Sequence, residues 1–172
     1  PIYKFPFDLF ISQSWDVEHI DSATTNDLRN IEDKEAWLQE SINILNLRDD
    51  EEIRQWMDEK NYDEVWAKVL QRSSSPEGDE SKKDSIGNLT LLDAETNRGY
   101  GNHIFALKRK EIQHVIQSGT FVPVCTQMVF NKSFESQNTD LRAWSDDDKD
   151  RYTDFIIGEL KSFYNIKEET NE

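Results

Sequence analysis

The sequence predicts an α+β domain in which two short strands and a helix form a small core among further helices. Three patterns support this prediction. Residues 14–20, and more loosely 2–10, alternate apolar and polar side chains, and this period of two indicates a short strand. Residues 86–92 form a compact apolar run that suits a second, buried strand. Between them, residues 33–72 carry apolar side chains at helical spacing, so we expect a helical insertion over about 21–85.

The composition is typical of a folded, soluble chain. Of its 172 residues, 35% are hydrophobic, and they include nine Phe, five Trp and five Tyr. This predicts one domain, residues 1–172, with enough large side chains to bury a core. No stretch approaches the roughly twenty apolar residues of a membrane span, and no secretory signal is present. The single Cys125 excludes an internal disulfide and predicts a reducing, cytoplasmic location, while the start at Pro1 predicts a fragment of a longer protein.

The charge is strongly acidic overall but unevenly distributed. The net charge is −15, which argues against a surface that binds nucleic acid everywhere. Residues 86–132, however, carry five basic and three acidic side chains, whereas the segments on either side are acidic. We therefore expect a small element that faces nucleic acid within an acidic body. Its candidate phosphate contacts are Arg98, Lys108, Arg109 and Lys110, for which plain solvent exposure is the alternative.

The insertion is predicted to contain three helices. Their apolar side chains are Trp37, Ile44 and Leu45 in the first, Ile53, Trp56 and Met57 in the second, and Tyr62, Val65, Trp66, Val69 and Leu70 in the third. We expect the Trp side chains to form a core or a contact surface rather than a platform for stacked bases. Residues 73–83 are polar and contain Pro and Gly, so a loop is predicted to end the insertion.

A turn and a basic helix are predicted after the second strand. Residues 93–102 are rich in Gly and Asn, which indicates a turn. The following helix should end before Gly119, and the side chains on its apolar face are Phe105, Ile112, Val115 and Ile116. Residues 121–124 are expected to form an edge strand at best, because Pro123 has no N–H to donate to a ladder.

A closing amphipathic helix is predicted over about 146–164. Ser145 and Asp148 have the spacing of a capping box, in which the carboxylate lies three residues after the cap. Apolar side chains then follow at helical spacing: Tyr152, Phe155, Ile156, Leu160 and Phe163. This element completes a helical surround for the small core.

Four residues together have the chemistry of a metal-dependent nuclease. Glu18 offers a carboxylate and Asn97 a carbonyl oxygen, which are ligands that a hard divalent cation accepts, with waters and phosphate oxygens completing its shell. His19 follows Glu18 on the opposite face of the strand and suits the general base that deprotonates an attacking water. Asn88 would hydrogen-bond across the hairpin and fix the loop or the imidazole.

The motifs that carry these residues resemble the HNH, or ββα-metal, nucleases. They are similar in particular to the C-terminal domain of GmrSD-type modification-dependent restriction proteins, and also to the HNH domain of RNA-guided CRISPR effectors. The resemblance has its core in residues 15–20 and 86–117. It is carried by Asp16-Val17-Glu18-His19-Ile20, by Ile86-Gly87-Asn88-Leu89-Thr90-Leu91-Leu92, and by Asn97-Arg98-Gly99-Tyr100-Gly101-Asn102 with Phe105 and Lys108.

The resemblance implies a fold, an activity and roles for single residues. The fold would be a ββα-metal core embedded among helices, and the activity hydrolysis of DNA phosphodiester bonds, as an endonuclease or nickase. His19 would be the general base, Glu18 and Asn97 the ligands of Mg²⁺ or Mn²⁺, and Asn88 a structural partner, with Asn102 as the alternative ligand. The domain would follow an N-terminal nucleotide-hydrolysing sensor of modified DNA in the cytoplasm of a bacterium or archaeon, in defence against phage.

Two departures from the family pattern keep alternatives open. Asp21-Ser22-Ala23 follows His19-Ile20 where the family has a small spacer and a Pro, and 65 residues separate the two strands. A catalytically degenerate HNH fold that serves as a binding or regulatory module is therefore the competing hypothesis, and cleavage of RNA rather than DNA is a third. His103 is a weaker candidate for the site, and His114 and Cys125 are interpreted as structural.

Overall fold

A computed structural model describes residues 6–21, 30–74, 79–96, 103–135 and 140–166. The elements are α1 (Phe7–Ser12), β1 (Asp16–His19), α2 (Ile31–Ile44), α3 (Glu51–Asp58), α4 (Tyr62–Ser73), the short 3₁₀ turns η1 (Glu80–Lys82) and η2 (Ile86–Asn88), β2 (Leu89–Leu92), α6 (Phe105–Gln117), α7 (Val124–Asn131) and α8 (Asp146–Phe163). This helix-rich arrangement with one small sheet agrees with the expected α+β class.

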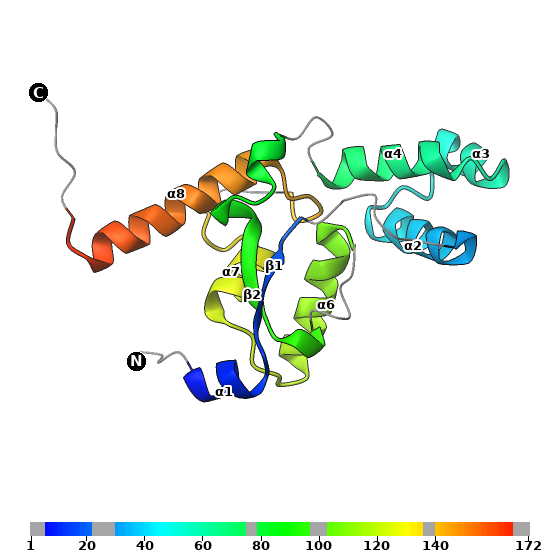
Figure 1. Ribbon diagram of the computed structural model, residues 1–172. Helices are drawn as coiled ribbons and strands as arrows, with labels where there is room; N and C mark the ends of the chain where they lie inside the picture. The colour runs from blue at the N-terminus through cyan, green and yellow to red at the C-terminus, as the bar shows by residue number, and fades with distance from the viewer. Residues whose placement is uncertain (1–5, 22–29, 75–78, 97–102, 136–139, 167–172) are drawn as a thin grey trace, which may run out of the picture.

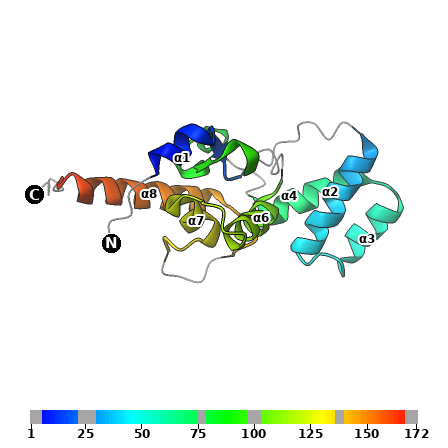
Figure 2. The same cartoon turned by 90° about the horizontal axis from the view of Figure 1, so that it is seen from below.

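The two strands pair although three helices separate them in sequence. β1 and β2 are antiparallel, with Glu18 opposite Thr90 and His19 opposite Leu89. The strands lie side by side at the centre of the molecule, α6 and α7 lie against the sheet, and α2, α3 and α4 form a separate group (Figure 1). From below, that group and α8 extend to opposite ends of an elongated molecule (Figure 2). The entropic cost of closing a loop grows only logarithmically with its length, so the long insertion is thermodynamically tolerable.

The side chains form two apolar clusters, and α6 contributes to both. The first unites α2, α3 and α4, where the Trp37 and Trp66 rings stack with centroids 4.1 Å apart. The second joins the sheet to α6, α7 and α8, and there the Phe105 ring stacks on Trp144 at 5.4 Å. Leu107 belongs to the first cluster and Phe105 to the second. α6 therefore connects the insertion to the strands.

Three segments differ from the sequence prediction. Residues 7–12 form helix α1 rather than extended chain. Of the run 86–92, only Leu89–Leu92 is a strand, because residues 86–88 turn into η2. Residues 121–123 form no strand, and Pro123 instead precedes the first turn of α7, where its fixed φ suits a helix start.

The closing helix begins as its capping box indicates. The Ser145 side chain accepts a hydrogen bond from the backbone N–H of Asp148, and the Asp148 carboxylate accepts one from the backbone N–H of Ser145. In the part of the chain that the structure describes, no helix has the length and apolar character needed to cross a bilayer.

Candidate active site

Glu18 and His19 lie at the end of β1, on neighbouring positions of the strand. Successive side chains of a strand point to opposite faces. The Glu18 side chain is the more buried of the two, and its Oε1 accepts a hydrogen bond from Lys108 Nζ on α6 at 3.2 Å. The Lys108 ammonium also donates to the carbonyl oxygen of His19, at 2.7 Å. One lysine thus holds both the carboxylate and the backbone of this pair.

Lys108 is completely buried, with no exposed side-chain surface. Burial lowers the pKa of its ammonium. The nearby carboxylates oppose this shift, and Glu18 has the largest opposing effect. A buried charge is tolerated when it is paired and hydrogen-bonded, and both conditions are met here. Lys108 therefore lies beneath the strand and contacts protein, not solvent, which differs from the exposed phosphate contact expected of it.

His19 makes a specific contact on the other side of the strand. Its Nε2 lies 2.8 Å from Asp84 Oδ1, across 65 residues of sequence. Asp84 belongs to the short segment between η1 and η2. Asp84 was not predicted from the sequence, because nothing in the local pattern around it connects it to β1.

Asn88 is buried and joins the chain segments on either side of the site. Its Nδ2 donates to the carbonyl oxygen of Asp21 at 3.0 Å and to that of Lys83 at 2.8 Å. Its Oδ1 accepts from the backbone N–H of Asp21 at 2.9 Å, and its own carbonyl accepts from the N–H of Ile20 at 2.8 Å. The side chain is used almost completely, so Asn88 acts on the backbone around His19 and not on the imidazole.

The segment that carries Asn88 packs closely on α8. A Cβ atom built on Gly87 would lie 2.0 Å from the carbonyl oxygen of Lys149, so only glycine allows this approach. The Lys149 ammonium also lies 3.8 Å from the Asp21 carboxylate. Asp21 begins the segment that departs from the family pattern, and here its backbone is held by Asn88 and its carboxylate is near Lys149.

The remaining candidates are divided between described and undescribed residues. Asn97, Arg98 and the alternative ligand Asn102 lie outside the described residues. Arg109 is partly buried, and desolvation lowers the pKa of its guanidinium. Lys110 is exposed, as a contact to phosphate requires.

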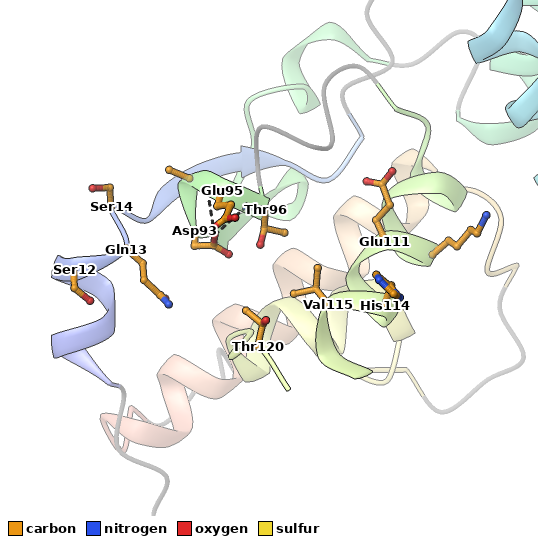
Figure 3. Close-up of a pocket in the computed structure, with 12 residues that line it drawn as sticks. Ser12, Gln13, Ser14, Asp93, Glu95, Thr96, Glu111, His114, Val115 and Thr120 are labelled. Atoms are coloured by element: carbon orange, nitrogen blue, oxygen red, sulfur yellow. Dashed lines mark hydrogen bonds between the residues drawn. The ribbon is translucent and has the colours of Figure 1, made fainter. Parts of the chain in front are cut away.

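The two remaining histidines, His103 and His114, make other contacts than the Glu18–His19 pair on β1. His103 Nδ1 lies 3.2 Å from the Glu111 carboxylate. His114 is exposed on α6 and lines a pocket of about 850 Å³ (Figure 3). The pocket lies between residues 12–14, the segment after β2, and α6, and its lining does not include Glu18 or His19.

The charge of this pocket does not favour the binding of phosphate. Asp93, Glu95 and Glu111 contribute three carboxylates, against one ammonium from Lys110. Asp93 is also committed to the backbone, because its Oδ1 accepts hydrogen bonds from the N–H groups of Glu95 and Thr96. Figure 3 shows these last two bonds as dashed lines. We therefore place the candidate active site at the end of β1 and not in this pocket.

The described residues contain one of the two expected metal ligands. Among them, no group of three or more His, Cys, Asp or Glu is placed to hold a metal ion. Glu18 presents Oε2, which within the described residues accepts no hydrogen bond, while Oε1 is paired with Lys108. A single carboxylate oxygen fits Mg²⁺, which is commonly held by one or two carboxylates with waters and substrate phosphates.

One signal for the role of Lys108 was present in the sequence. Lys108 lies three residues after Phe105 and four before Ile112, both of which belong to the apolar face of the same helix. A lysine at that spacing is expected to be buried and to need an acidic partner. The basic run Lys108-Arg109-Lys110 instead favoured a single interpretation for all three residues.

A carboxylate and a histidine at the end of a short antiparallel strand, with a buried asparagine beside them, are compatible with a nuclease. Residues 9–157 match the family model described as "GmrSD restriction endonucleases, C-terminal domain", and the chain belongs to this family. Membership supports a nuclease of the restriction-endonuclease type, and the HNH motifs fit the family. Neither the curated proteins nor the solved structures give a match to the chain.

Proposed function

We propose that the chain is a divalent-metal-dependent HNH endonuclease or nickase domain that hydrolyses DNA phosphodiester bonds. Its ββα-metal core would consist of β1, β2 and the segment from Ala94 through α6, with α2, α3 and α4 as an insertion within one domain. In this proposal it is the cutting domain of a cytoplasmic anti-phage protein whose N-terminal part hydrolyses nucleotide and senses modified DNA. The observation that carries the proposal is the Glu18–His19 pair at a strand end, in a chain of this family.

Each residue of the proposed site has a distinct task. Glu18 Oε2 and the Asn97 carbonyl would hold Mg²⁺ or Mn²⁺. When bound, the cation neutralises charge at the scissile phosphate and at the leaving oxygen. His19 accepts the proton of the attacking water, and Asn88 fixes the backbone that carries His19. Lys110 and Arg98 would contact phosphate, and Arg109 would do so from a partly buried position.

Plasmid cleavage tests the proposal. We expect supercoiled plasmid to be nicked or linearised by the purified chain with Mg²⁺ or Mn²⁺ and not with EDTA. His19→Ala should slow cleavage by about 10²–10⁴, the range for loss of a general base. His114→Ala is the matched control, because His114 is exposed on α6 and should cleave like the wild type. Equal cleavage by His19→Ala and wild type would refute the assignment of His19.

A second candidate function is a degenerate HNH fold that binds a partner without cutting. The Lys108–Glu18 pair favours it, because a protein cation already neutralises the carboxylate that should bind the metal. Titration with Mn²⁺, followed by electron paramagnetic resonance, separates the two functions. A site that saturates in wild type and is lost in Glu18→Gln supports the nuclease, whereas no site in either supports the binding module. Parallel assays on single-stranded RNA decide between DNA and RNA as substrate.

A further inference from the structure

We propose that Asp84 is a positioning residue that fixes the His19 imidazole with Nδ1 as its basic nitrogen. The inference rests on the proposed function and extends the same site. His19 Nε2 lies 2.8 Å from Asp84 Oδ1. An ionised carboxylate can only accept hydrogen bonds, so Nε2 must carry the hydrogen in this contact. The lone pair of a neutral imidazole then resides on Nδ1, which is the atom left to take a proton from water.

A single buried amide holds together the two segments that carry this pair. Asn88 Nδ2 donates to the carbonyl oxygens of Asp21 and Lys83. Asp21 lies two residues after His19, and Lys83 lies one residue before Asp84. Hydrogen bonds therefore hold the backbone close to both His19 and Asp84. Two unrelated surface side chains would not share this support from a buried side chain.

Helix α8 fixes the same segment from outside. Lys82 Nζ donates to Asp150 Oδ2 at 2.5 Å, and Asp146 Oδ2 accepts from the backbone N–H of Asp79 at 2.9 Å. Gly87 closes the segment against the carbonyl of Lys149, where no side chain fits. Asp84 therefore lies on a braced turn, which can hold a catalytic base in one orientation.

The chemistry that follows is a simple proton transfer. Water loses a proton to His19 Nδ1 as its oxygen bonds to phosphorus. The bond from phosphorus to the leaving oxygen breaks, and this oxygen departs with the electron pair and takes up a proton from solvent, while Nε2 keeps its hydrogen bond to Asp84. Because the Asp84 side chain is 83% exposed, water competes for this bond, and we expect an effect of about 10-fold on rate, far below the loss caused by removing His19.

Single-turnover cleavage and a double-mutant cycle test the proposal. Asp84→Ala should lower the rate about 10-fold with the Kd for DNA unchanged, and Asp84→Asn, which keeps an acceptor oxygen, should recover part of the loss. Asp154→Ala, an exposed aspartate on α8, is the charge control and should match the wild type. In a His19→Ala background, Asp84→Ala should have no further effect, because it acts only through His19. An unchanged or faster rate in Asp84→Ala overturns the proposal.

A measurement without catalysis distinguishes failure of this proposal from failure of the proposed function. In ¹⁵N-labelled chain without metal, the ¹⁵N chemical shifts of the His19 ring should show the hydrogen on Nε2 and a basic Nδ1, and this preference should weaken in Asp84→Ala and persist in Asp154→Ala. A His19 ring with its hydrogen on Nδ1 in the wild type refutes the Asp84 contact even if the chain cuts DNA. If the ring shifts behave as expected but no variant cuts DNA with metal, the contact stands as structure and its catalytic role falls with the nuclease.

Discussion

The insertion (α2, α3 and α4) and the strand region (β1, β2, η1, η2, α6, α7 and α8) differ in where they place charged side chains. In α2, α3 and α4 the described buried residues are apolar apart from Tyr62, Ser41 and Ser73, and ionised groups such as Lys68 remain partly exposed. The strand region instead buries polar and charged side chains in its described part: Asn88, Thr90, Asp93, Lys108, Thr126, Lys132, Asp148 and Lys149. Apolar burial alone is enough to build the insertion. Buried charges cost solvation free energy, so the strand region depends on ion pairs and hydrogen bonds such as Lys108–Glu18 and Lys132–Asp148.

The largest contrast is expected between two aspartates. Asp148 is almost fully buried, with its Oδ2 2.8 Å from Lys132 Nζ, while Asp50 pairs with Lys68 at the surface of the insertion. Asp148→Asn should lower the free energy of unfolding at pH 7 by about 3–5 kcal/mol, since it breaks a buried pair. Asp50→Asn, at a partly exposed pair, should lower it by only about 1 kcal/mol. Urea unfolding measures both.

The pH dependence of this contrast has a defined sign. Desolvation would raise the pKa of Asp148, but hydrogen bonds from Lys132 and the Ser145 backbone outweigh it and hold the pKa below its ordinary value of 3.8. The stabilisation is therefore complete above about pH 4 and is lost as the pH falls through the folded-state value. The wild type and Asp148→Asn should converge below pH 4. A gap that stays constant from pH 7 to pH 3 would contradict this assignment.

Two lysines give the next contrast. Lys108→Met leaves the Glu18 carboxylate without its cation, and we expect a loss of about 3 kcal/mol, at the lower end of the range for a broken buried pair because Glu18 retains some contact with water. Lys68→Met removes two ion pairs in the insertion but should cost only about 0–1 kcal/mol. Thermal unfolding of both variants checks the difference. Equal losses would mean that burial does not distinguish the two regions.

The insertion was the easier region to predict from sequence. Its helices follow from apolar spacing, and Val65 and Val69 are fully buried where the third helix predicts a core face. A motif in the sequence also predicts Glu18 and His19 as a candidate pair, and the structure places them on neighbouring positions of β1. Asp84 and the buried pairing of Lys108 were not predicted, because these contacts join residues 65 and 90 positions apart, and local periodicity carries no information on such distances.

Helix α7 was missed for a different reason. Its sequence, Val124–Asn131, contains several β-branched residues and follows a Pro, so local propensity favours extended chain. Packing decides otherwise, because Val129 and Phe130 complete the apolar cluster under the sheet. Tertiary burial thus overrides propensity in the strand region, whereas propensity and burial agree in the insertion.

The smallest contrast concerns two glycines, Gly87 and Gly158. The strand region is built partly by close approach of backbone segments, whereas residues 30–74 contain no glycine. Gly87→Ala would place a methyl group 2.0 Å from the Lys149 carbonyl oxygen, so the braced turn must move, at a cost of about 1–3 kcal/mol. Gly158→Ala on α8 meets no atom within 4 Å and should stabilise the helix by about 1 kcal/mol.

The cleavage rates of Gly87→Ala and Gly158→Ala test whether the braced turn also matters for activity. Because Asn88 follows Gly87 directly, displacement of the turn should loosen the backbone around Asp21 and His19 and slow cleavage. Gly158→Ala should raise the melting temperature without changing the cleavage rate. If Gly87→Ala lost stability but cut DNA at the wild-type rate, the bracing by α8 would serve folding alone, and the position of His19 would depend on β1 and Lys108.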